Sequence, residues 1–153
     1  MPSKRDALRE WKQIVGRVRR LARARKLDAK VGASTTREVV HHVVEANVVA
    51  ASIIVAALGA PGCTYDWSWM MPFGPWMTRM RYDEKPIGPA LRLLSALNAY
   101  VVAQIEPLPD GLRRTVRLRD RPRGRTRSVT VADVLLQEAD HAREEVEDAL
   151  KGG

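Results

Sequence analysis

Histidine is the residue type in this chain most suited to site chemistry, and it occurs at His41, His42 and His141. Neutral imidazole binds zinc, nickel and ferrous iron. If 41 and 42 are helical, His42 shares its face with an apolar row of residues, whereas the row of His41 is partly polar and includes Glu45. Neighbouring helical residues point about 100° apart, so both imidazoles cannot face one small site. We therefore predict that His42 points inward and that His41 lies at the rim or surface.

Carboxylates surround the third histidine. Helical spacing places Glu138, His141 and Glu145 one above the other, on or beside an apolar face, with Gln137 one turn before His141. Burying carboxylates and an imidazole together is unfavourable unless they pair or coordinate a cation. A divalent metal such as zinc, nickel or iron would offset that cost, and so would a carboxylate–imidazole hydrogen bond. Two histidines and one carboxylate would leave coordination positions open for water or substrate, as a catalytic metal site requires.

Two other chemical patterns are incomplete. Glu138-x-x-His141 is half of a carboxylate-bridged di-iron motif, but His42-x-x-Glu45 runs in the reverse order and cannot supply the other half. Cys63 is the single cysteine, which excludes an internal disulfide, and no Cys–His spacing marks it as a nucleophile. We therefore favour a mononuclear site and treat the thiol as incidental.

Four helices are expected to position these residues. Apolar periodicity and capping patterns predict helices over about 5–25, 35–59, 89–105 and 131–152, and alternation predicts a hairpin that pairs 115–118 with 127–130. Helices of these lengths with one short hairpin form a bundle by their simplest packing. We predict an all-α protein, with residues 1–153 forming one four-helix-bundle domain and the hairpin between its third and fourth helices.

The segment 60–85 between the second and third helices is rich in large apolar side chains. Trp67, Trp69 and Trp76 lie in it, together with four methionines. Such residues cap the core, line a ligand pocket beside the histidines, or form a dimer contact. The three tryptophans are our candidates for pocket-lining residues.

The net charge of +8 is concentrated in residues 1–30 and 113–127. Basic segments attract acidic partners, but neither segment interleaves aromatic residues as single-strand binders do. We interpret both as solvated surface and expect no nucleic-acid partner. The N-terminus lacks a signal-peptide pattern, and the uninterrupted apolar stretch 48–58 is too short to span a bilayer. We therefore expect a cytoplasmic protein without a membrane partner.

Two segments resemble the DinB/YfiT-like superfamily. Residues 34–47, STTREVVHHVVEAN, are similar to the second helix of that family, and residues 112–150 are similar to its hairpin and last helix. The resemblance implies a four-helix bundle, often dimeric, in which three histidines hold a divalent metal. It matches His42 to the first of those ligands. Some family members are S-transferases or isomerases that depend on a low-molecular-weight thiol.

The last helix departs from the family pattern, because it has one histidine where the family has two, four residues apart. If His141 matches the second of these, Gln137 stands at the first, and the metal site is damaged because glutamine is a weak ligand. If His141 matches the first, Glu145 stands at the second and a two-histidine, one-carboxylate triad remains. Glu138, Glu45 and His41 are further candidates as ligands or supporting residues.

Two functions follow as hypotheses. The first is a metal-dependent DinB-like enzyme, a transferase or isomerase that uses a thiol and acts on a small molecule. The second is a non-catalytic bundle with a degenerate metal site, which binds a partner or an apolar ligand. The family resemblance supports the first, and the missing third histidine motivates the second. A homodimer is compatible with both.

Overall fold

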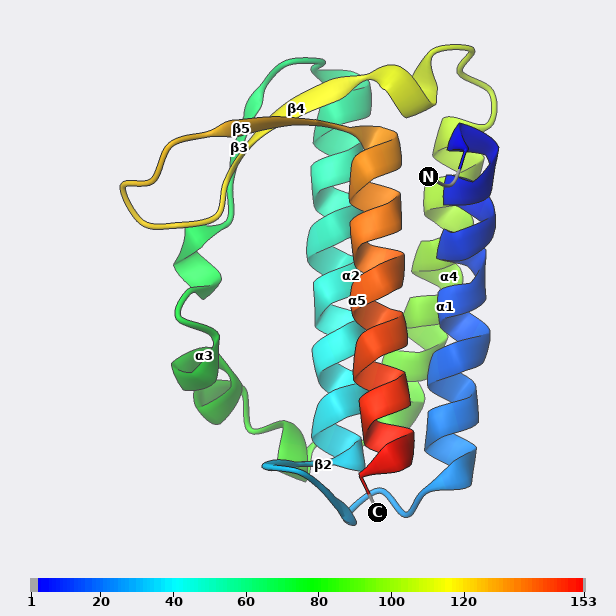
Figure 1. Cartoon of the computed structure of the whole chain (residues 1–153), viewed down its shortest axis with the longest axis vertical. Helices are drawn as coiled ribbons and strands as arrows, with labels where there is room; N and C mark the ends of the chain where they lie inside the picture. Colours follow the sequence, from blue (N-terminus) through cyan, green and yellow to red (C-terminus); the bar gives the residue numbers. More distant parts are fainter. Residues whose placement is uncertain (1–2, 153) are drawn as a thin grey trace.

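The computed structural model describes residues 3–152 and contains a bundle of four long helices (Figure 1). These helices are α1 (Lys4–Ala24), α2 (Thr36–Gly59), α4 (Ile87–Ile105) and α5 (Val131–Lys151). A short helix, α3 (Phe73–Met80), and three 3-10 turns, η1 (Ser68–Met70), η2 (Tyr82–Glu84) and η3 (Gly111–Arg113), lie in the connections. The predicted four-helix bundle is confirmed, and each predicted helix is present to within about two residues.

The helices do not simply alternate in direction. In Figure 1, α2 and α4 both run from the lower to the upper end of the bundle, whereas α1 and α5 run downward. Two consecutive parallel helices need a connection that returns along their whole length. Residues 60–86 make that return on the outside of the bundle, and α3 lies on this crossover. The sequence predicted a loop here, because α3 has only eight residues and buries none of them.

A small sheet covers the upper end of α2 and α5. The predicted hairpin is confirmed: β4 (Thr115–Arg119) pairs antiparallel with β5 (Arg127–Thr130), and Thr115 lies opposite Thr130. The crossover adds a third strand, β3 (Thr64–Asp66), parallel to β4. This strand and the two-residue pair β1 (Lys30–Val31) and β2 (Ser34–Thr35) were not predicted. Segments this short carry no readable alternation.

Both helices that carry the site histidines begin at a capping box. The Thr35 hydroxyl accepts a hydrogen bond from the Glu38 amide at 3.2 Å, and the Glu38 carboxylate accepts from the Thr35 amide at 3.1 Å. Thr130 and Asp133 make the same reciprocal pair at the start of α5, at 3.1 and 2.8 Å. Each box pairs amides that the helix itself leaves without partners. These caps fix where α2 and α5 start, and hence which side chains face each other.

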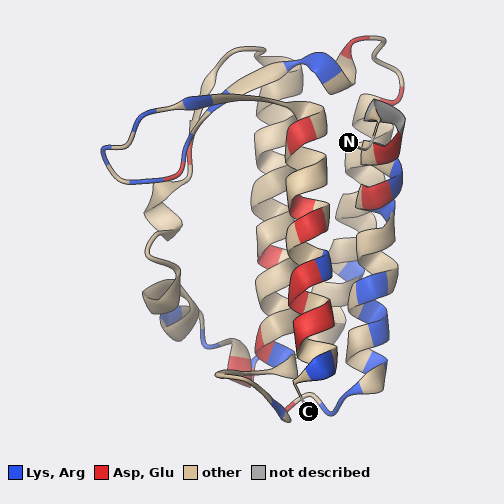
Figure 2. Ribbon diagram, in the orientation of Figure 1, with Lys and Arg blue, Asp and Glu red and all other residues tan. Residues whose placement is uncertain are grey.

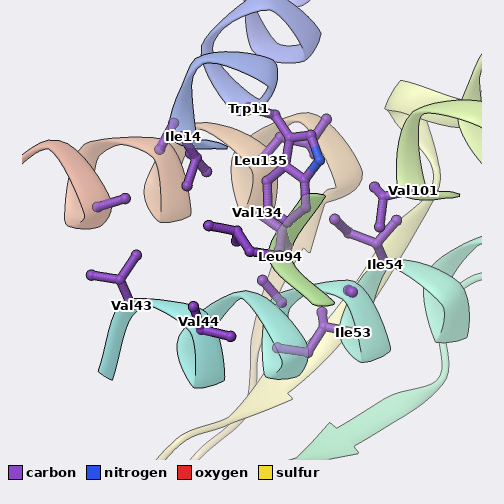
Figure 3. Close-up of a cluster of buried hydrophobic side chains, with 14 of the residues drawn as sticks. Trp11, Ile14, Val43, Val44, Ile53, Ile54, Leu94, Val101, Val134 and Leu135 are labelled. Atoms are coloured by element: carbon purple, nitrogen blue, oxygen red, sulfur yellow. The ribbon is translucent and has the colours of Figure 1, made fainter. Parts of the chain in front are cut away.

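Helix α2 also supplies much of the core. By length and composition it is apolar enough to cross a bilayer, but 56% of its most apolar 18-residue stretch is buried inside the protein. Val43, Val44, Ile53 and Ile54 pack there against side chains of the other three long helices (Figure 3). The apolar character of α2 is thus used in helix packing.

One pair of polar contacts joins α1 to α4 within this core. Trp11 is fully buried among core side chains (Figure 3), and its indole Nε1 donates to the Asn98 carbonyl at 3.2 Å. The Asn98 amide Nδ2 donates in return to the Trp11 carbonyl at 2.7 Å. Because the Trp11 indole and the Asn98 amide are both buried, these two hydrogen bonds satisfy their polar atoms and fix the position of α1 relative to α4.

We expect Asn98→Ala to lower the free energy of unfolding by about 1–3 kcal/mol, because it removes the buried amide that pairs with Trp11. Urea unfolding followed by circular dichroism measures the change. Gln104→Ala, at an exposed position of the same helix, should stay within about 0.5 kcal/mol of the wild type. Equal effects of the two substitutions would show that the pair does not hold α1 to α4.

Candidate metal centre

The structure brings His42 of α2 and His141 of α5 into contact. Their Nε2 atoms are 3.0 Å apart, and the rings are nearly perpendicular at 83°. Oε1 of Glu145, one turn after His141, lies 3.7 Å from each Nε2 atom. Three atoms of the kind that bind divalent metals therefore converge from two helices.

The spacing of these atoms fits a single metal ion. A tetrahedral zinc ion with bonds of about 2.0–2.1 Å separates its ligand atoms by roughly 3.3 Å, close to the 3.0 and 3.7 Å found here. Without a cation, one Nε2–H must donate to the other imidazole. The side chains of His141 and Glu145 are 34% and 38% exposed, so one side of the group is open to water or a substrate. The donor set and its opening thus fit a catalytic type of metal site.

Glu138 and Asn47 support His141 from behind. Oε1 of Glu138 lies 3.5 Å from Nδ1 of His141, a long contact, and accepts a hydrogen bond from Nδ2 of Asn47 at 2.9 Å. Asn47 is fully buried and also donates to the Val43 carbonyl. A carboxylate on the far nitrogen fixes the orientation of a ligand imidazole. Glu138 is therefore placed to support His141, with Asn47 holding its carboxylate.

The environment shifts the proton affinities of these groups. Burial raises the pKa of Glu138, because it penalises the charged carboxylate. The pKa of His141 is raised mainly by its contact with Glu138. The contact with His42 lowers the pKa of Glu145, which keeps this carboxylate ionised at neutral pH. An ionised Glu145 is suited to bind a cation.

His41 lies away from this group, as the helical geometry predicted, but it is not at the surface. His41 is only 8% exposed, and its ring stacks on that of Tyr82 with the ring centroids 5.5 Å apart. Its Nε2 atom lies 3.1 Å from the carbonyl oxygen of Lys85. The prediction of a rim or surface position was wrong, because the crossover covers this side of α2. Glu45 is covered in the same way: its Oε2 accepts from the Tyr82 hydroxyl and from Trp76 Nε1.

A cavity of about 450 Å³ opens beside the imidazoles. Trp67 lines it, as predicted, whereas Trp69 and Trp76 do not. Trp69 is 55% exposed and packs on Trp76, whose indole is bonded to Glu45. The prediction for these two residues was wrong. Aromatic content marked the segment, but which rings face the cavity depends on how the crossover folds over α2.

Gln137 and Glu145 were the two candidates for the third ligand. Gln137 lines the cavity but is exposed, whereas Glu145 lies with the two histidines. The geometry therefore favours the two-histidine, one-carboxylate set. That these residues hold a metal stays a prediction.

Sequence reasoning missed Asn47 and Phe73 as parts of the site. Phe73 packs edge-on against His42, with ring centroids 4.5 Å apart, and Nδ1 of His42 is buried without a hydrogen-bond partner among the described residues. The sequence did hold a signal for Asn47, because an amide side chain within an otherwise apolar helix is unusual. Nothing in the sequence distinguished Phe73 from the other large side chains of the crossover.

Comparison with solved structures relates this arrangement to a known one. The structure superposes on YfiT from Bacillus subtilis with a TM-score of 0.78 and 15% sequence identity. The superposition covers 97% of this chain and 84% of the YfiT chain. The chain has the YfiT fold. YfiT is described as a probable metal-dependent hydrolase with an unusual four-helix bundle topology, and the resemblance predicted from the sequence is confirmed at the level of the fold. No family model and no curated protein sequence matches the chain.

We expect Asn47→Ala to weaken zinc binding by about ten- to a hundredfold, because Glu138 would lose the donor that holds its carboxylate near His141. Competition with a chromophoric zinc chelator measures the affinity. Ser52→Ala is the matched control, because Ser52 lies on the same helix and its hydroxyl accepts a hydrogen bond from Tyr65 rather than from a residue of the site, and this variant should bind zinc like the wild type. Unchanged affinity in Asn47→Ala would remove Asn47 from the support of the site.

Proposed function

We propose that this chain is a divalent-metal-dependent enzyme that hydrolyses a small molecule, with His42, His141 and Glu145 as the metal ligands. The convergence of these three side chains, of which His42 and His141 line the cavity, carries the proposal. The hydrolase description of YfiT, which shares the fold, supports the choice of reaction. Zinc, nickel and ferrous iron all suit two imidazoles and a carboxylate.

A divalent ion held by these residues supplies Lewis acidity toward water and toward a carbonyl oxygen. The protein supplies the surroundings. Glu138 would orient His141, the ionised Glu145 would balance part of the charge of a bound cation, and Phe73 packs edge-on against the His42 ring. The cavity on the open side admits a substrate. An apolar shell of this kind limits the access of water and lowers the local dielectric constant, which strengthens the electrostatic effect of the ion.

The thiol-dependent S-transferase or isomerase activity implied by the family resemblance is our second candidate. The side-chain arrangement alone does not require a thiol. An activity that appears only when a low-molecular-weight thiol is added would favour this candidate over hydrolysis. The cytoplasmic location, the homodimer and the absence of nucleic-acid and membrane partners likewise stay predictions.

We expect the purified wild-type protein, prepared without a polyhistidine tag, to take up about one zinc ion per chain. His42→Ala, His141→Ala and Glu145→Ala should each lose most of that zinc, because each removes one of three ligands. Gln137→Ala is the control, since Gln137 lines the cavity outside the ligand group. Elemental analysis after gel filtration gives the content, and circular dichroism verifies folding.

Two results would count against this assignment. A folded wild-type protein that takes up no zinc, nickel or iron would contradict the metal-dependent function and favour the non-catalytic bundle. Loss of metal in Gln137→Ala with retention in Glu145→Ala would keep the function but replace the third ligand. If the assignment is correct, the rate of hydrolysis of ester and amide substrates should follow the metal content of the variants.

A further inference from the structure

The cavity beside the metal centre is elongated along the helices. Its lining on α2 begins at His42 and continues through Ala46 and Ala50 to Ile53. At a rise of 1.5 Å per residue, this row is roughly 16 Å long. On α5 the lining runs from His141 back to Val134, near the start of the helix. Both rows thus lead from the imidazoles toward the sheet at the upper end of the bundle (Figure 1).

Most of the polar groups that line this cavity gather toward its two ends, and the indole Nε1 of Trp67, which is buried without a partner among the described residues, is a further polar atom of its lining. At one end are the two site histidines, with Gln137 and Glu138 beside them. At the other end Asp120 and Arg127 pair with each other at 3.6 Å, so their charges largely balance. The remaining lining is apolar or aromatic and comes from four parts of the chain, namely Ala46, Val49, Ala50 and Ile53 of α2, Val134 of α5, Trp67, Met70, Met71 and Phe73 of the crossover, and Leu118 of β4.

Small side chains create the space in the middle of the cavity. Ala46 and Ala50 stand one and two turns beyond His42, on the wall opposite the crossover. A longer side chain at either position would project into the room between α2 and the crossover. The cavity therefore offers an elongated, mostly apolar groove that starts at the two imidazoles, and the matching ligand has an extended hydrocarbon body with its reactive polar group at one end.

We propose that the substrate is an acyl compound, an ester or amide whose carbonyl group lies at the imidazole end and whose unbranched hydrocarbon chain fills the cavity toward the sheet. Hydrolysis then adds water across the acyl bond: the carbonyl carbon gains the hydroxyl group, the bond to oxygen or nitrogen breaks, and the alcohol or amine leaves with a proton. This inference rests on the proposed metal-dependent hydrolysis and adds its substrate class.

The test uses straight-chain alkyl hydroxamates of increasing length on the zinc-loaded protein, because the hydroxamate group binds the metal while the chain probes the cavity. Isothermal titration calorimetry gives Kd for each length. We expect the affinity to rise roughly fourfold per added methylene until the chain fills the cavity. Ala46→Phe should abolish the gain for the longer chains and leave the shortest hydroxamate unaffected.

Val48→Phe is the matched control for this substitution. Val48 is 40% exposed and lies on α2 outside the cavity, so the same added ring should leave the chain-length dependence intact. If circular dichroism shows that Ala46→Phe does not fold, Val49→Asn takes its place, because a polar wall also reduces the gain per methylene. Both cavity variants should keep their zinc.

The outcomes separate the substrate class from the metal function. Wild-type protein that holds zinc but binds all hydroxamates equally would overturn the acyl-chain proposal and leave the metal centre standing. If no zinc is bound, the proposed function fails, and metal-free protein is titrated with the neutral probe N-phenyl-1-naphthylamine. Displacement of the probe by long-chain alcohols in the wild type but not in Ala46→Phe would support the apolar cavity. No binding of the probe would overturn it.

Discussion

The parallel direction of α2 and α4 is the constraint on which the site depends. Two parallel helices that follow each other in sequence require a return segment as long as the helices. In this chain that segment is 60–86, and it lies against the outside of the bundle (Figure 1). It adds β3 to the hairpin, covers His41 with Tyr82, and supplies the wall of the cavity opposite α2. The topology thus turns one face of α2 into a wall of the cavity beside the histidines.

The carboxylates of α5 divide into those at its surface and one, Glu138, that is largely buried beside His141. Helix α5 carries several carboxylates on its outer face beside the basic lower half of α1, where solvent screens their charges (Figure 2). Glu138, in contrast, is only 11% exposed. Its burial is unfavourable unless it is paired, and the Asn47 amide and His141 provide that pairing. A protein that needed only stability would favour an apolar residue there, so this arrangement points to function.

The sequence predicted what depends on local signals. Thr35 and Thr130 marked the starts of α2 and α5, and helical spacing separated His42 from His41 and placed Glu145 beside His141. It failed where long-range packing decides. The burial of His41, the outward position of Trp69 and the strand β3 all follow from the path of the crossover. That path is set by contacts between segments about 50 residues apart in the chain, such as β3 with β4, and no local pattern records them.

A carboxylate in place of a third imidazole changes the electrostatics of the site. Two neutral imidazoles would leave a bound divalent cation with its full +2 charge, whereas an ionised Glu145 would reduce the net charge of the ligated group to +1. A lower charge weakens the pull on the electrons of a bound carbonyl or water. The apolar cavity wall acts in the opposite sense, since a low dielectric constant strengthens every remaining charge interaction. A metal-bound form of this site would therefore combine a weaker electrophile with a mostly apolar cavity wall, a balance suited to substrates that are themselves apolar.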